Sequence, residues 1–350
     1  MNLPEKLAAF KPYPAMTGAP PVRLDGNESC FCIPQDMRDE IAEAVRHIDL
    51  HRYPDPYAAE VCASAERFWG APEGSAVAGN GSDELISIAL GALLPRGGKL
   101  LVCDPDFTMY RFYAALYELD CIGLDRFSGV PDTGEIIQKG KNTDAVILSN
   151  PCNPTGQALP LEDVLRVVEA LDCPVLLDEA YMDFWDGGKH SVLPYIKRYK
   201  HLIVLKTCSK NLALAGIRLG FAFAGEELAS LLRSVKSPYN VSALAQAAGA
   251  VLLQRPEWIH ENTARLMEAK DRLYKRLSGW ARDIESASVT DTVANFVLLT
   301  LPDAEEWHTY LQSQGISVRL AGGALRITAG TEAEEDALLA ALNKRWEDIP

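Results

Sequence analysis

The sequence predicts an α/β fold with two domains, and three observations support this prediction. The chain has 350 residues, 48% of them hydrophobic, which is enough apolar material for a large core. From residue 76 onward, short apolar runs alternate with helical patterns, as in a mainly parallel sheet flanked by helices. The pattern changes near residue 240, where a smaller α+β domain is expected. We therefore predict an N-terminal arm over 1–24, a large domain over 25–240 and a small C-terminal domain over 241–350.

The strands of the large domain are expected at continuously apolar segments, because a strand that is covered on both faces carries apolar side chains on both. These segments are 100–103, 121–124, 145–148, 174–177, 202–205 and 219–224. Helical patterns are expected at 35–48, 57–69, 82–94, 107–117, 161–171 and 226–236.

The small domain is expected to begin with a long helical stretch over about 243–277. Thr331 and Glu334 have the spacing of a capping box, so the C-terminal helix is predicted to start beside them. The remaining elements are a strand at 293–300, a helix at 303–314 and short strands near 316–319 and 324–328.

Composition and charge exclude several classes of partner. The net charge is -14, which repels nucleic acid and anionic membranes, so we expect neither as a partner. No apolar run approaches the ~18–20 residues of a membrane span, and the proline-interrupted start of the chain lacks the apolar core of a signal peptide. The eight cysteines form no CxxC pair and the six histidines show no zinc-type spacing. We therefore expect reduced thiols, a cytoplasmic protein and no metal.

Two polar loops follow predicted strands, at the edge where open α/β sheets bind ligands. Residues 79–84 read Gly-Asn-Gly-Ser-Asp-Glu and precede an apolar helix, so backbone N–H groups and the helix dipole are suited to an anion. A plain turn with Ser82 as the helix cap is the alternative. Residues 149–156 form a loop made rigid by two prolines, which is also compatible with a structural turn.

Two charged residues lie at or beyond the ends of apolar strands. Asp178 follows the run 174–177, where an unpaired carboxylate is costly, so it needs a partner or a ligand cation; a helix cap is the alternative. Lys210 lies among small and apolar residues, surroundings that make an amine a usable nucleophile and base; a solvated surface lysine is the alternative.

Taken together and in this order, the four segments give the chain a family resemblance. It resembles the histidinol-phosphate aminotransferases, which are pyridoxal 5'-phosphate (PLP) enzymes of fold type I. The resemblance covers nearly the whole chain and is carried by the phosphate loop at 79–84, Asn-Pro-Thr-Gly at 153–156, Asp-Glu-Ala-Tyr-x-Asp-Phe at 178–184, and Thr-x-Ser-Lys at 207–210 with Arg218 eight residues further on.

The resemblance implies PLP as the cofactor and assigns a role to each residue around its ring. Lys210 is expected to hold the cofactor as a Schiff base and to move the substrate proton. Asp178 is expected to pair with the pyridine nitrogen, and Asn153 and Tyr181 to hydrogen-bond the phenolic oxygen. Phe107 is expected to stack on the ring, with an ordinary core position as the alternative. Lys210, Asp178 and Tyr181 are thus the implied catalytic residues.

The resemblance also implies how the cofactor phosphate is bound. Tyr53 resembles a tyrosine that reaches this phosphate from the neighbouring subunit, which implies a homodimer; otherwise Tyr53 is a simple loop anchor. Within the chain, the implied phosphate ligands are Gly81, Ser82, Thr207, Ser209 and Arg218.

The substrate end is implied by four further residues. Arg319 and Arg326 are expected to bind the phosphate of the substrate, or a carboxylate of the keto acid. Tyr13 is expected to close over that phosphate, and Asn27 to lie near the substrate. The chain departs from the family's usual N-x-N-E-N-P at residues 25–30, and residues 319–325 are short and glycine-rich, so the resemblance fixes the cofactor more firmly than the substrate.

The implied reaction transfers an amino group between L-histidinol phosphate and 2-oxoglutarate through a PLP Schiff base, in L-histidine biosynthesis. Two related enzymes remain as alternatives: a threonine-phosphate decarboxylase of cobalamin synthesis and an aromatic amino acid aminotransferase. A ligand sensor fused to a DNA-binding domain is disfavoured, because the chain is acidic and shows no basic helix-turn-helix segment.

Overall fold

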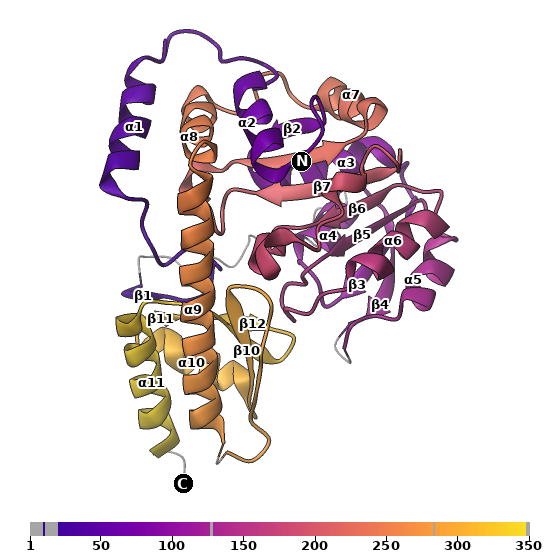
Figure 1. The fold of residues 1–350 in the computed structure, drawn as a ribbon. Coiled ribbons are helices and arrows are strands. Elements are labelled where there is room, and N and C mark those ends of the chain that lie inside the picture. The colour runs from indigo at the N-terminus through magenta and orange to yellow at the C-terminus, as the bar shows by residue number, and fades with distance from the viewer. Residues whose placement is uncertain (1–9, 11–19, 127–128, 283, 348–350) are drawn as a thin grey trace, which may run out of the picture.

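The structure, a computed structural model, describes residues 10, 20–126, 129–282 and 284–347. A large α/β part and a smaller part built on a second sheet lie side by side (Figure 1). The long helix α9 (Pro256–Ala281) runs along both parts (Figure 1). It contacts the short helix η2 (Met182–Phe184) in the first part and β9 (Ser288–Thr290) and β10 (Phe296–Thr300) in the second. The α/β class is confirmed, and the predicted domain bounds stay a prediction.

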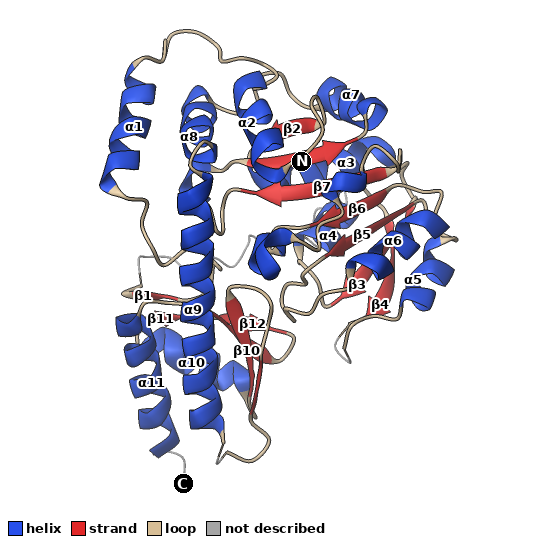
Figure 2. Cartoon of the chain, in the orientation of Figure 1, coloured by secondary structure: helices blue, strands red, loops and turns tan. Residues whose placement is uncertain are grey.

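The large sheet has the order β2-β8-β7-β6-β5-β3-β4 and is mainly parallel (Figure 2). Within the described residues, β8 is the strand of this sheet that runs opposite to the other six. The bounds are β2 (Ala76–Gly79), β3 (Lys99–Asp104), β4 (Asp120–Asp125), β5 (Ala145–Ser149), β6 (Val175–Asp178), β7 (Leu202–Thr207) and β8 (Gly220–Ala224).

Each strand expected in the large sheet is present within two residues of its predicted bounds. Among the strands of the large sheet and the α-helices that cover it, two were not predicted. Strand β2 has the sequence Ala-Val-Ala-Gly, whose small residues have weak strand propensity. Helix α5 (Thr133–Gly140) is short and carries glycine at two positions, which weakens its helical pattern.

Helices cover both faces of this sheet, which explains why its strands are continuously apolar. In β3, Leu100 and Val102 face one core, while Leu101 and Cys103 face the other. The first core is covered by α3 (Gly81–Leu93), α4 (Met109–Leu116) and α7 (Glu226–Val235), and the second by α2 (Ala59–Trp69), α5, α6 (Leu161–Ala170) and α8 (Ala243–Leu253). Outside these layers lie α1 (Gln35–Arg46), which contacts α8, and the short helices η3 (Asp186–Gly188), η4 (Leu193–Tyr195) and η5 (Ala215–Ile217).

The four polar segments meet at one edge of the large sheet. Gly79, Ser149, Asp178 and Thr207 are the last residues of β2, β5, β6 and β7. Because these strands run in the same direction, their carboxyl ends lie together, as the sequence predicted.

The smaller part contains the antiparallel sheet β12-β13-β10-β9 and a core of its own. Near it, β1 (Val22–Arg23) pairs in parallel with β11 (Ile316–Ser317). The predicted capping box is present, because the Thr331 N–H donates to the Glu334 carboxylate at 2.8 Å and the Glu334 N–H donates to the Thr331 hydroxyl at 3.3 Å. The remaining bounds are α10 (Ala304–Ser313), β12 (Arg319–Ala321), β13 (Ala324–Thr328) and α11 (Glu332–Glu347).

The stretch predicted to be helical over about 243–277 is helical, but it is divided into two helices, α8 and α9. Pro256 occupies the first turn of α9. A proline has no backbone N–H and forces the preceding residue, here Arg255, out of the helical conformation, so α8 ends before it. Among the described residues, no helix has both the length and the apolar surface to cross a membrane.

Candidate active site

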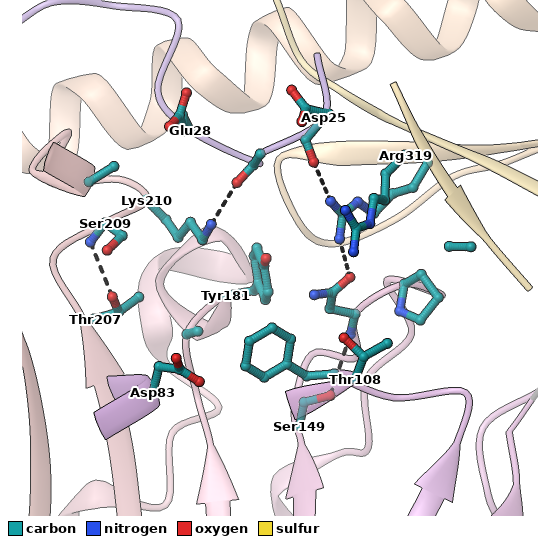
Figure 3. Close-up of a pocket in the computed structure, with 18 of the residues that line it drawn as sticks. Asp25, Glu28, Asp83, Thr108, Ser149, Tyr181, Thr207, Ser209, Lys210 and Arg319 are labelled. Carbon is teal, nitrogen blue, oxygen red and sulfur yellow. Dashed lines mark hydrogen bonds between the residues drawn. The ribbon is translucent and has the colours of Figure 1, made fainter. Parts of the chain in front are cut away.

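A cavity of about 770 Å³ opens at the carboxyl edge of the large sheet and extends to the second sheet. Lys210 and Arg319 point into it from opposite sides (Figure 3). Most of the predicted site residues line its wall: Gly81, Ser82, Phe107, Asn153, Asp178, Tyr181, Thr207, Ser209, Lys210, Arg218, Arg319 and Arg326. The fold therefore brings segments from both sheets to one place.

Lys210 presents its amine to the centre of the cavity. It follows strand β7 by three residues and is half-buried. Its Nζ donates to the carbonyl oxygen of Gly26 at 2.8 Å and lies 5.8 Å from the centre of the Tyr181 ring. The amine is thus held by a neutral acceptor, which a ligand in the cavity can replace.

Asp178 forms the floor of the cavity with a buried carboxylate that is 5% exposed. The Tyr110 hydroxyl donates to Oδ2 at 2.8 Å and the Ala180 N–H donates to Oδ1 at 3.0 Å. Burial raises the pKa of Asp178 to about 6, and these two hydrogen bonds only partly oppose that rise. A cation bound against this carboxylate would offset the cost of its burial. Tyr110 was not among the predicted site residues, although it follows Phe107 by three residues.

The N-terminus of α3 forms a cradle for an anion. Gly81 has a φ of +79°, and a Cβ atom there would lie 2.9 Å from Nη2 of Arg218. A Cβ atom on Gly220 would lie 2.2 Å from the Ser82 nitrogen. Glycine at both positions therefore lets the Arg218 guanidinium and strand β8 approach the helix N-terminus, where N–H groups and the helix dipole attract negative charge. The helix begins at Gly81, so Ser82 is not its cap.

Thr207 and Ser209 lie on the same side of the cavity as Asp83, which is in the first turn of α3 (Figure 3). The Ser209 N–H donates to the Thr207 hydroxyl at 3.2 Å, which fixes the turn between strand β7 and Lys210. Arg218 has a φ of +58°, and its Nη1 donates to the Ala215 carbonyl at 3.2 Å. The cradle therefore combines backbone and hydroxyl donors with a positioned guanidinium.

The opposite end of the cavity carries two arginines. Arg319 on β12 and Arg326 on β13 are paired in register, so their side chains lie on the same face of the small sheet. Arg326 donates to Oδ1 of Asn153 and to the carbonyl oxygen of Asp25. Its guanidinium also lies 5.6 Å from the centre of the Phe296 ring. This end of the cavity therefore suits an anionic group of a ligand.

Asn27 lies behind the cavity wall and is fully buried. Its Nδ2 donates to the Tyr181 hydroxyl at 2.8 Å, so it orients this tyrosine. Phe107 does line the wall, with its ring edge-on to Tyr110 at 5.6 Å between centroids. Tyr13 lies outside the described residues.

Tyr53 does not line this cavity. Its side chain is 81% exposed and stacks on Tyr239, with 4.6 Å between the ring centroids. Leu50 and Leu244 lie with them around a shallow surface groove, and all four side chains are exposed. A cluster of exposed apolar side chains of this kind is typical of a surface that meets another protein.

A buried cluster of charged side chains lies behind the site and was not predicted from the sequence. Nζ of Lys206 lies 3.1 Å from the Glu179 carboxylate and 3.0 Å from the Asp183 carboxylate, and the Trp69 indole donates to Asp183 at 3.0 Å. The cluster ties strand β7 to the segment that carries Asp178. The available signal was a lysine inside an otherwise apolar strand, which needs a buried partner.

Comparison with known proteins adds to this geometry. The family described as aminotransferase class I and II matches residues 19–342. Histidinol-phosphate aminotransferase from Clostridium kluyveri is 32% identical over 354 residues, which cover 97% of each chain. The protein of the same name from Thermococcus kodakarensis is 35% identical over 349 residues, which cover 98% of each chain.

The fold agrees with a solved structure. The crystal structure of histidinol-phosphate aminotransferase from Sinorhizobium meliloti in complex with pyridoxal-5'-phosphate has a TM-score of 0.89 at 20% identity, and the match covers 99% of this chain and 98% of that one. At this identity the likeness shows a shared fold. On the near-complete matches to the family and to its members, the chain belongs to the class I and II aminotransferases, and its cofactor is pyridoxal 5'-phosphate.

Proposed function

We propose that the enzyme transfers the amino group of L-histidinol phosphate to 2-oxoglutarate, a step of histidine biosynthesis. The observation that carries this proposal is the paired Arg319 and Arg326, which face Lys210 across one cavity. The names of the near-full-length relatives support the same substrate. We also propose a cytoplasmic location, where the eight cysteines, all free in this structure, stay reduced.

The residues around the cavity fit PLP at both ends of that molecule. Glycines at 81 and 220 leave open a cradle that an added Cβ atom would fill, and Arg218 can give a phosphate a bidentate contact there. Thr207 and Ser209 would add hydroxyl donors. At the floor, a protonated ring nitrogen would place a cation against the buried carboxylate of Asp178.

The chemistry divides between the cofactor and the chain. When bound through Lys210, PLP supplies an electron-accepting ring that stabilises the negative charge left on the substrate Cα after deprotonation. Asp178 would hold the proton on the ring nitrogen. Once the substrate amine has displaced Lys210 from the cofactor, the free Nζ would take the proton from the substrate Cα as a general base. Asn153 and the hydroxyl of Tyr181, which Asn27 orients, would hold the phenolic oxygen.

The second anion site serves both substrates in turn. Arg319 and Arg326 would bind the phosphate of L-histidinol phosphate, and then a carboxylate of 2-oxoglutarate after the first product leaves. Arg326 already donates to Asn153, so substrate binding and cofactor binding share this contact. Tyr13 is proposed to close over the same phosphate.

The substrate is tested by incubating the purified enzyme with L-histidinol phosphate and 2-oxoglutarate. We expect glutamate to form in equal amount to the histidinol phosphate consumed. Carbon dioxide from phosphothreonine without glutamate would assign the decarboxylase activity instead. A higher kcat/KM for phenylalanine or tyrosine than for L-histidinol phosphate would assign the aromatic aminotransferase activity.

We further propose a homodimer in which Tyr53 reaches the cofactor phosphate of the partner subunit. Tyr53 lies outside the cavity of its own chain and on an exposed apolar surface with Tyr239 and Leu244. Two-fold symmetry places the same surface on both subunits, so the contact would complete both sites.

Mixing inactive variants tests this exchange. Tyr53→Ala and Lys210→Ala are each expected to be nearly inactive as homodimers. In a mixed dimer, the chain that retains Lys210 receives Tyr53 from its partner, so one site is intact. A statistical mixture should therefore recover about a quarter of the wild-type rate. If Tyr53 acts within its own chain, mixing restores nothing; each variant, incubated alone in parallel, is the control.

A further inference from the structure

Two more donors, Arg23 and Ser317, line the cavity near the end that is suited to bind an anion. Strands β1 and β11 pair in parallel with Arg23 opposite Ser317, and paired residues on adjacent strands point to the same face. Both residues line the cavity, as does Arg319 two positions beyond Ser317. Neither Arg23 nor Ser317 belongs to a motif of the family resemblance.

The second residue, Ser317, has a buried hydroxyl group that could hydrogen-bond a ligand. The residue is 1% exposed, and within the described residues its Oγ has no hydrogen-bond partner. A buried hydroxyl without a partner destabilises a fold, so such groups are rare and call for an explanation. Since Ser317 lines the cavity, an oxygen atom of a bound ligand would supply the partner.

Arg23 is placed at the mouth of the cavity by an ion pair. Its Nη2 lies 3.1 Å from the Glu28 carboxylate, and the two side chains are 57% and 42% exposed. Glu28 also lines the cavity (Figure 3). Exposed pairs of this kind contribute little free energy, so a ligand with two negative charges can compete for the guanidinium.

We infer that Arg23 and Ser317 extend the site of Arg319 and Arg326 and make it selective for a phosphate ester over a carboxylate. This inference rests on the proposed function. A carboxylate has two oxygens and one charge, and a single arginine satisfies it with a bidentate contact. A phosphate monoester has three terminal oxygens and nearly two charges. The third oxygen and the second charge match the two extra donors.

Arg23→Gln and Ser317→Ala test the inference in the holoenzyme. We expect each to lower kcat/KM for L-histidinol phosphate roughly tenfold, mainly through KM, because each removes one hydrogen bond to a charged group. The kcat/KM for 2-oxoglutarate should fall by no more than about threefold, because a carboxylate accepts fewer hydrogen bonds from these donors. Equal losses for both substrates, or no loss for either, contradict the inference.

Two control variants match these changes outside the cavity. Arg198 is 65% exposed and pairs with Glu169 at 2.6 Å, so Arg198→Gln removes the same charge from a similar surface pair. Ser278 on α9 has a buried Oγ without a partner in the described part of the chain, so Ser278→Ala removes a comparable hydroxyl. Both controls should keep the wild-type ratio of the two kcat/KM values.

A binding measurement separates this inference from the proposed function. Inorganic phosphate and acetate are titrated into the holoenzyme by calorimetry, with the cofactor occupying its own phosphate cradle. We expect Arg23→Gln and Ser317→Ala to weaken phosphate binding roughly tenfold and acetate binding less. Absence of turnover with L-histidinol phosphate refutes the proposed substrate, whereas unchanged phosphate affinity refutes the inference. If Ser317→Ala folds poorly, Arg23→Gln alone tests the inference, because Arg23 is exposed and its replacement should not affect folding.

Discussion

Replacing Lys210 with alanine is expected to lower transamination by at least ~10⁴-fold while the protein stays folded. One amine is assigned two tasks, the attachment of the cofactor and the removal of the proton from the substrate Cα, so its loss removes both. The side chain is half-buried and donates to a single carbonyl, Gly26 O, so its removal should cost little stability.

Borohydride treatment followed by peptide mass analysis tests this without relying on turnover. Borohydride makes the bond between cofactor and lysine permanent, so the wild-type peptide containing Lys210 should gain the mass of the reduced cofactor. The Lys210→Ala protein should gain none. Lys189, which is 73% exposed and pairs with Asp186, provides the matched control Lys189→Ala, which should keep both the label and the activity. Labelling of another lysine in the wild-type enzyme would overturn the assignment.

The cofactor end of the site was predictable because its residues follow buried parallel strands. Ser149, Asp178 and Thr207 end β5, β6 and β7, whose continuous apolar runs are visible in the sequence. Parallel strands bring their carboxyl ends to one edge, so residues far apart in the chain are expected to converge there. The direction of a buried strand thus carries information on where its last side chain lies.

The substrate end was less predictable because it depends on pairing between distant segments. The pairing of Arg23 with Ser317 requires β1 to lie beside β11, from the opposite end of the chain. A short strand was expected near 316–319, but β1 has only two residues and shows no apolar pattern of its own, so the pairing was not predicted. Asn27 was expected near the substrate, yet its amide turns toward the Tyr181 hydroxyl, a contact that only the packed structure reveals. Side-chain direction at this end is therefore set by tertiary packing.

Replacing Asp178 with asparagine is expected to have opposite effects on activity and on the stability of the cofactor-free protein. Transamination should fall by about 10³-fold, because an amide cannot hold a proton on the ring nitrogen and the ring then accepts electrons poorly. Without the cofactor, however, the wild-type carboxylate is buried, and burial raises its pKa from 3.8 to about 6. The amide removes this cost, so the cofactor-free variant should be the more stable protein near neutral pH.

The pH dependence of this difference distinguishes the electrostatic cause from a change in packing. Between about pH 4 and pH 6 the folded protein binds more protons at Asp178 than the unfolded chain does, so the contribution of Asp178 to wild-type stability falls as pH rises through this window. The loss amounts to about 3 kcal/mol by pH 7. Urea unfolding should therefore show the variant's advantage growing from near zero at about pH 4 to this value. A difference independent of pH would mean that packing, and not the buried charge, separates the two proteins.

With PLP bound, the order of stability of the two proteins should reverse. The ring nitrogen then supplies a cation to the carboxylate, so the group that destabilises the empty site is the one that holds the cofactor in its active form.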